Sequence, residues 1–163
     1  IVTATGLNLV TLGKTALSID GKPTKLADHF NYKGVMFSDV PNLASVFGYI
    51  NASWTLKTDI VADYVCRLLK TMDAKGASIA NPKLGDTNMP RLPFVSDFSS
   101  GYFARSIDNL PANGEHHPWR VLQDYKAEKK ILTKDAVDDG TLVFSNPVAG
   151  AANDAAAALV AAE

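Results

Sequence analysis

The most regular feature of the chain is a stretch from residue 54 to residue 72 in which apolar and polar positions recur at helical spacing. Apolar side chains follow one another at steps of three and four residues, and most charged side chains fall between them. This spacing predicts an amphipathic helix that begins near Ser53, and Gly76 is a natural cap at its C-terminal end. The predicted core face comprises Leu56, Ile60, Val61, Tyr64, Val65, Leu68, Leu69 and Met72, and the predicted solvent face comprises Lys57, Asp59, Asp63, Arg67 and Lys70.

Shorter apolar runs before this helix predict strands. Residues 1–5 have the composition of a buried strand. A short alternating stretch leads into Asp20-Gly21, a dipeptide that suits a hairpin turn with positive φ, and predicts a β-hairpin. Two compact runs, 34–38 and 43–47, are separated by a turn that contains proline and asparagine, and they predict strands buried on at least one face.

Prolines mark the boundaries of the elements expected after the helix. Three of them lie between residues 77 and 93 and favour a loop or an extended cover there. A short helix is predicted within 100–110, and a longer one over 119–132, with Pro118 in its first turn. The order of elements is that of a mixed α/β protein.

The C-terminal end combines a short strand with a segment of low complexity. Residues 141–144 follow a turn of two aspartates and a glycine and predict a strand. Residues 147–163 are mostly alanine, which favours helix but offers few large side chains to bury. We expect a frayed helix or a disordered end there.

Composition narrows the classes of function and compartment. The 163 residues carry a formal net charge of -1, so the chain lacks the basic field of a nucleic-acid-binding protein. No apolar run reaches the roughly 20 residues that a membrane span needs. Cys66 is the single cysteine, which excludes an intrachain disulfide, fits a reducing compartment and favours a cytoplasmic location. Its apolar neighbours predict a buried structural thiol.

Motifs for metal, phosphate or nucleophilic chemistry are weak. His116-His117 lies in a polar loop without the further ligands that a metal site needs, so a solvated loop is predicted. The sequence contains neither G-x-G-x-x-G nor a Walker A motif, and no G-x-S-x-G nucleophile elbow.

The junction before the long helix, Gly48 to Trp54, is unusually polar and aromatic for a connector. Asn51 or Ser53 can cap the helix, whose first N–H groups have no internal partners and suit an anionic or electron-rich ligand edge. Tyr49 and Trp54 can offer flat apolar surface to a planar ring. The pattern alone favours the structural alternative, in which the polar residues are ordinary caps and Trp54 packs in the core.

Several separated segments, in order along the chain, are similar to those of one enzyme family. They are Ile1-Val2-Thr3-Ala4-Thr5-Gly6, Tyr32-Lys33-Gly34-Val35-Met36, Val40-Pro41-Asn42, the run from Gly48 to Lys57, and Pro118-Trp119-Arg120. Together they resemble the C-terminal third of class B flavin-dependent monooxygenases, within the Baeyer–Villiger branch that includes the ethionamide-activating enzyme. The resemblance covers about residues 1–145.

This resemblance implies a fold and a division of the chain. The fold would be the C-terminal part of a Rossmann-like, three-layer α/β fold that binds FAD and NAD(P), followed by a helical and extended C-terminal region. Residues 1–76 would complete the FAD-binding domain, residues 77–146 would cover it, and residues 147–163 would form an alanine-rich tail.

The resemblance also implies cofactors and a site. Family members use FAD and NADPH to insert one oxygen atom from dioxygen beside a ketone carbonyl or to oxidise sulfur compounds, and most of that chemistry belongs to the cofactor. The residues implied to border the cofactors are Thr5, Gly6, Tyr49, Asn51, Ser53, Trp54 and Thr55. The family's glycine-rich fingerprints and active-site arginine have no counterpart in this chain, so no catalytic residue is assigned and the isolated chain is expected to be inactive.

Two alternatives remain beside this hypothesis. A noncatalytic α/β interaction module could keep the scaffold without the cofactors. A flavin disulfide reductase is disfavoured because its redox cysteine pair is missing. A small-molecule substrate is the expected partner of the parent enzyme, and unpaired strand edges predict that the isolated chain associates with itself.

Overall fold

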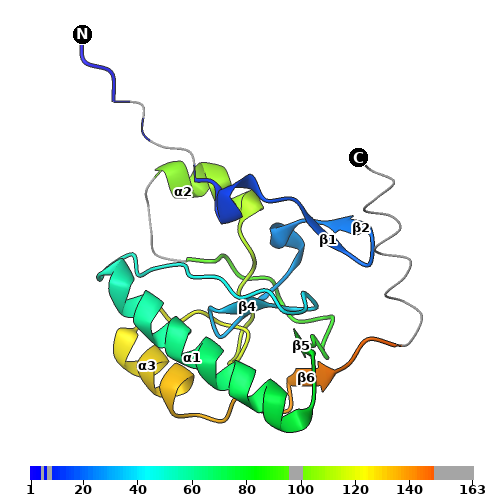
Figure 1. Cartoon of the computed structure of the whole chain (residues 1–163). Helices are drawn as coiled ribbons and strands as arrows, with labels where there is room; N and C mark the ends of the chain where they lie inside the picture. Colours follow the sequence, from blue (N-terminus) through cyan, green and yellow to red (C-terminus); the bar gives the residue numbers. More distant parts are fainter. Residues whose placement is uncertain (5, 7–8, 96–100, 149–163) are drawn as a thin grey trace.

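A computed structural model of the chain describes residues 1–4, 6, 9–95 and 101–148, apart from the side chain of Tyr102 (Figure 1). Thr5 and all but the first two residues of the predicted alanine-rich tail lie outside these residues. The described part is a mixed α/β structure with short strands and three α-helices, α1 to α3.

The predicted long helix is confirmed as α1, Trp54–Lys75. It ends where Gly76 adopts a left-handed conformation with φ of 60°, which glycine tolerates because it has no Cβ. Helix α3, Tyr125–Thr133, lies beside α1 and runs in the same direction (Figure 1). Together the two helices form one side of the molecule.

The start of α3 differs from the prediction that a helix covers 119–132. Residues 119–124 are not helical, and the helix begins only after Asp124, whose side chain accepts hydrogen bonds from the N–H groups of Lys126 and Ala127. An aspartate in this position is a strong N-cap, and it determines the start more directly than the proline upstream. The predicted short helix is confirmed as α2, Gly101–Ser106, continued by the 3-10 helix η3, Ile107–Asn109.

The predicted hairpin is also confirmed. Strand β1, Leu17–Ile19, pairs antiparallel with β2, Lys22–Thr24. Asp20 and Gly21 form the turn with φ of 50° and 75°, as a two-residue hairpin loop requires. The 3-10 helices η1, Thr11–Lys14, and η2, Leu26–Asp28, flank this hairpin.

Two more antiparallel pairs complete the described strands. Strand β3, Asn31–Tyr32, pairs with β4, Met36–Phe37, and β5, Ile79–Pro82, pairs with β6, Leu142–Ser145. Strand β6 confirms the strand predicted over 141–144, whereas β5 lies in a segment predicted to be a loop or an extended cover. Pro82 is compatible with β5 because it is the last residue of the strand, where a missing N–H costs little.

Two predicted strands do not form. Residues 1–4 are exposed and outside any sheet, and residues 43–47 have no strand ladder, although Ser45 donates its N–H to the carbonyl of Val35. Side chains along 43–47 nevertheless alternate between half-buried and exposed, which is the burial pattern of a strand. The named sheets of the described residues are two-stranded and antiparallel, and the expected three-layer fold is not seen among them.

The main core lies between the two long helices and the short sheets. Its largest fully buried side chains include Tyr32, Tyr49 and Tyr64. A second cluster includes Phe94 and Phe103, the latter from α2, and a third packs against the hairpin residues Leu17 and Ile19. These clusters give the short strands their support, since isolated two-stranded sheets are marginal in water.

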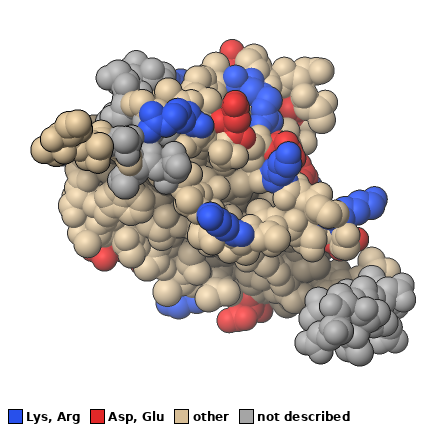
Figure 2. Space-filling view, turned by 90° about the horizontal axis from the view of Figure 1, so that it is seen from above, with Lys and Arg blue, Asp and Glu red and all other residues tan. Residues whose placement is uncertain are grey.

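The surface mixes both signs of charge. Figure 2 shows lysines and arginines interspersed with aspartates and glutamates on the face seen from above. In the part of the chain that the structure describes, no helix is long and apolar enough to cross a membrane.

Candidate functional site

The junction at the start of α1 turns outward. Trp54 is the first residue of the helix and is 54% exposed, so it is not a core residue. Its ring packs against Phe47, with 5.3 Å between ring centroids. The ring also lies directly on the backbone of Gly48, where a Cβ would stand 2.2 Å from a Trp54 ring carbon. Gly48 is therefore required for this position of the indole.

The first turn of α1 is not capped as predicted. Ser53 occupies the N-cap position, but its hydroxyl lies 2.8 Å from the Thr55 hydroxyl and accepts no bond from the helix backbone. Within the described residues, the Asn51 side chain caps no N–H group either. Asn51, Ser53 and Thr55 are exposed beside Trp54. The free N–H groups give this end of α1 a partial positive charge.

A buried ion pair supports the junction from below. Lys57 Nζ lies 2.8 Å from Glu128 Oε2, and the two side chains are 1% and 4% exposed. Burial lowers the pKa of Lys57, and the neighbouring carboxylate opposes that shift. The other oxygen of Glu128 accepts the N–H groups of Leu122 and Gln123, at 3.1 and 3.3 Å. The carboxylate therefore has partners for both oxygens, as a buried charge requires.

Placing Lys57 on the solvent face was wrong. Lys57 precedes Ile60 and Val61 by three and four residues, and both are buried, so the helical period itself places it on the core face. That period was the signal available in the sequence. Its charge alone suggested exposure, and its partner is 71 residues away along the chain.

Tyr49 packs with the buried pair of Lys57 and Glu128 and is not part of the exposed surface. It is 2% exposed, its ring centroid lies 5.6 Å from Lys57 Nζ, and its ring packs edge-on against Tyr125. Burial, together with Glu128 nearby, raises the pKa of its hydroxyl above the ordinary value. Among the predicted cofactor residues, Tyr49 thus lies beneath Asn51, Ser53, Trp54 and Thr55.

Two hollows flank the junction. One has a volume of about 220 Å³ and is lined mainly by apolar side chains, including Trp54 and Phe47. The other has a volume of about 790 Å³ and is lined by Asn51, Arg120 and other polar and apolar residues. Phe94 and Val121 line both hollows. The junction therefore stands between an apolar and a more polar cavity.

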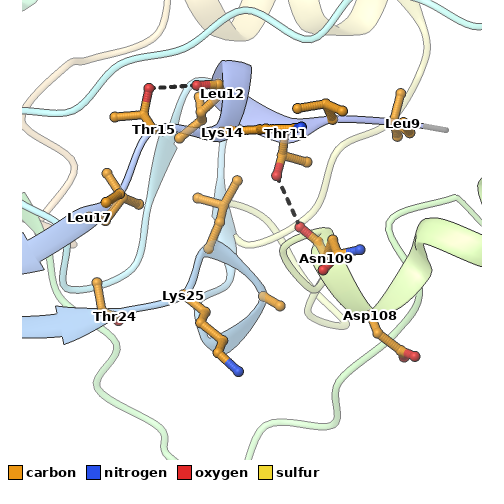
Figure 3. Close-up of a pocket in the computed structure, with 14 residues that line it drawn as sticks. Leu9, Thr11, Leu12, Lys14, Thr15, Leu17, Thr24, Lys25, Asp108 and Asn109 are labelled. Carbon is orange, nitrogen blue, oxygen red and sulfur yellow. Dashed lines mark hydrogen bonds between the residues drawn. The ribbon is translucent and has the colours of Figure 1, made fainter.

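A third hollow of about 420 Å³ lies between η1, the hairpin and η3 (Figure 3), and it shares Leu9, Thr11 and Leu26 with the lining of the 220 Å³ hollow. Thr11 donates its hydroxyl to the carbonyl of Asn109 at 3.4 Å, and Thr15 donates to the carbonyl of Leu12 at 2.6 Å. None of the seven predicted cofactor residues lines it. Its threonine hydroxyls are occupied within the protein, so it has less to offer a ligand than the hollows at the junction.

Gly6 is not brought to the junction. It lines neither of the two flanking hollows and lies beside Arg105, whose Nη2 would stand 3.6 Å from a Cβ at this position. Thr5 lies outside the described residues. The structure therefore groups four of the seven predicted residues on one exposed surface.

Two other sequence predictions concern reactive side chains. His116 and His117 are exposed, as the predicted solvated loop requires, and the described residues contain no cluster of potential metal ligands. Cys66 was predicted to be buried and is exposed. It follows the buried Tyr64 by two residues, and two residues on a helix turn the side chain by roughly 200° to the opposite side.

Comparison with known proteins finds relatives over most of the chain. MymA of Mycobacterium tuberculosis, named as an FAD-containing monooxygenase, is 46% identical over 158 residues, which is 97% of this chain and 31% of that protein. AlmA of Acinetobacter baylyi, named as an FAD-binding monooxygenase, is 44% identical over 88% of this chain and 29% of its own length. The FAD-containing monooxygenase EthA of Mycolicibacterium smegmatis is 43% identical over 89% of this chain and 29% of its own length.

The other comparisons are negative. No protein-family model matches the chain, and no solved structure matches it. The chain spans about a third of the length of the curated relatives that it matches. Identity above 40% over nearly all of its residues makes this chain homologous to the matched third of these FAD-containing monooxygenases.

Proposed function

We propose that this chain supplies the C-terminal third of an FAD- and NADPH-dependent monooxygenase, which inserts one oxygen atom from dioxygen beside a ketone carbonyl or oxidises a sulfur compound. The observation that carries the proposal is the exposed junction 51–55, with Trp54 displayed at the uncapped start of α1 inside the homologous region. A location in the cytoplasm agrees with the single cysteine.

The residues of the junction fit the edge of a flavin better than its phosphates. The exposed indole of Trp54 offers apolar surface to a planar ring, and the free N–H groups at the helix start suit electron-rich ring oxygens. Asn51, Ser53 and Thr55 add polar groups that can orient the ring. FAD, when bound, supplies the redox and oxygen chemistry, whereas these residues would bind and orient it.

We also propose that the Rossmann-like layer is completed by another part of the longer protein. Residues 43–47 are extended and have alternating burial, but the hydrogen bond from Ser45 to Val35 is their single backbone bond among the described residues. A partner strand along the remaining edge would turn this segment into the strand that the sequence predicts. In this proposal, residues 1–76 complete the FAD-binding domain and residues 77–146 cover it.

An unpaired edge has a consequence for the isolated chain. An extended segment with free backbone groups is a template for pairing with a second copy, so the isolated chain should form dimers or larger assemblies. Light scattering over a concentration series tests this expectation. A sharp monomer of about 17 kDa at every concentration, the mass of one chain, would contradict it.

The cofactor proposal is tested with the chain alone and with a chimaera in which it replaces the aligned region of the M. tuberculosis relative. The isolated chain should bind FAD weakly or not at all, because it has no glycine-rich loop for the pyrophosphate. The chimaera should bind FAD and oxidise NADPH. Submicromolar binding by the isolated chain would contradict the division of the site.

A noncatalytic interaction module is the competing function, and the same chimaera separates the two. A folded chimaera that contains no flavin would favour the module. Substituting Trp54→Ala in a flavin-loaded chimaera then tests the junction itself, because the exposed ring should affect cofactor binding or turnover without unfolding the protein.

A further inference from the structure

The exposed junction is fixed on both sides by one closed ring of interactions. The N–H group of Ile50, just before the junction, donates to the side-chain carbonyl of Gln123 at 3.0 Å. The backbone N–H of Gln123 donates to Glu128, and Glu128 is paired with Lys57 in the first turns of α1. The chain from Ile50 to Lys57 closes the ring, and the exposed residues 51–55 lie within that closing segment.

Every link of this ring is specific in direction. Glu128 lies in the first turn of α3, where the helix dipole favours a negative charge, and its two oxygens serve different partners. One oxygen binds Lys57, and the other holds the loop that carries Gln123. Gln123 has φ of 55°, an uncommon conformation for a residue other than glycine. In this conformation the loop places the side-chain amide of Gln123 where its oxygen accepts the N–H of Ile50.

From this arrangement we infer that Gln123 is a positioning residue, which holds the junction 51–55 in the geometry that receives the ligand edge. The inference rests on the proposed function, since it concerns the same surface. Gln123 would act through Ile50 and not by touching the reacting atoms. Sites that are held by such supporting contacts lose less free energy to ordering when a ligand binds.

Two substitutions isolate the hydrogen bond from the packing. Gln123→Met keeps the length of the side chain but removes the acceptor oxygen, whereas Gln123→Glu keeps an acceptor at the same reach. The matched control is Leu122→Met, which introduces the same side chain at the neighbouring position, where the native side chain is 41% exposed. All three variants leave the pair of Lys57 and Glu128 intact.

The first measurement is amide hydrogen exchange of Ile50 by NMR in the 163-residue chain. Gln123→Met should speed exchange at Ile50 by about fivefold, the equivalent of one ordinary hydrogen bond, and lower the thermal midpoint by no more than about 2–4 °C. Gln123→Glu should restore most of the protection, and Leu122→Met should leave it unchanged. Unchanged exchange at Ile50 in Gln123→Met would overturn the inference.

The second measurement is FAD affinity in the chimaera. Gln123→Met should weaken FAD binding by about three- to tenfold, because the junction must then be ordered at the moment of binding. Faster exchange at Ile50 without any change in FAD affinity would also overturn the inference. If Trp54→Ala still alters flavin binding in that case, only the role of Gln123 fails; if it does not, the proposed function of the junction fails as well.

Discussion

In the part of the chain that the structure describes, two lysine–carboxylate pairs have a buried lysine and are chemically alike, but they differ in what they support. Lys57 lies 2.8 Å from Glu128, and Lys33 lies 2.7 Å from Asp139, with both lysine side chains 1% exposed. The pair of Lys57 leads through the neighbouring loop to the exposed junction. The pair of Lys33 joins the turn after β3 to the turn before β6, where Tyr32 also donates its hydroxyl to Asp139.

The difference between the pairs lies in the exposure of the acid. The Glu128 side chain is 4% exposed, whereas that of Asp139 is 20% exposed and can be reached by water. A buried pair is weak evidence for net stability, but removing one member leaves a charge without compensation. The role of such a pair therefore follows from the segments that it connects, and the cost of removing one member follows from the access of water to the pair.

The largest effect is expected from Glu128→Gln. This change leaves the Lys57 ammonium buried without a counter-charge, so it should lower the free energy of unfolding by about 3–5 kcal/mol. Urea unfolding measures the loss. The double variant Lys57→Met/Glu128→Gln should recover much of it, because no buried charge then remains, and a loss below about 1 kcal/mol for Glu128→Gln alone would break the comparison.

Asp139→Asn should cost less, about 2 kcal/mol near neutral pH, because water can reach the site. Burial works to raise the pKa of Asp139, but hydrogen bonds from Lys33 and Tyr32 outweigh it and hold the pKa below the ordinary 3.8. Stability from a carboxyl with a lowered pKa is present above the ordinary value and is lost as pH falls through the folded value.

The pH dependence provides the measurement for this second pair. The difference in unfolding free energy between the native chain and Asp139→Asn should shrink when pH falls from about 6 towards 3, as the native carboxylate becomes protonated. Urea titrations at several pH values give this difference. A constant difference across that range would show that the charge of Asp139 does not stabilise the contact between the turn after β3 and the turn before β6.

Trp54→Ala should change the unfolding free energy by less than about 1 kcal/mol, since truncation of a core tryptophan costs about 3–5 kcal/mol and this ring is half exposed. This small effect would contrast with the large loss of unfolding free energy expected for Glu128→Gln in the buried pair. Thermal and urea unfolding of the isolated chain provide the values. A loss of several kcal/mol would show that Trp54 stabilises the fold as a core residue does, and it would contradict its assignment to the ligand surface.

The smallest effect is expected from Asp138→Asn, next to Asp139 in the sequence. Asp138 lies 2.7 Å from Lys75, but the two side chains are 47% and 41% exposed. Exposed pairs contribute little after solvent screening, so the change should stay below about 0.5 kcal/mol. Equal losses for Asp138→Asn and Asp139→Asn would contradict the argument from water access.

Elements with local signals could be predicted from the amino-acid sequence. Asp20-Gly21 specifies the hairpin because its turn geometry needs those residue types, and the apolar period with Gly76 specifies α1 and its end. The motifs around Asn51 and Trp54, with the other separated segments, predicted the resemblance to flavin-dependent monooxygenases, and relatives named as FAD-containing monooxygenases match the chain. The helical period also places Lys57 on the core face, although a charged side chain by itself favours exposure.

Features that depend on distant partners could not be predicted from local sequence and arise from the fold. Strand β5 is a strand because β6 pairs with it from about 60 residues away, and residues 43–47 are not one because no ladder partner is present among the described residues. The ring that links Ile50, Gln123, Glu128 and Lys57 joins segments 71–73 residues apart. Local propensity acts over a few residues, whereas a buried charge or a strand edge is stabilised only by the group that the fold brings to it.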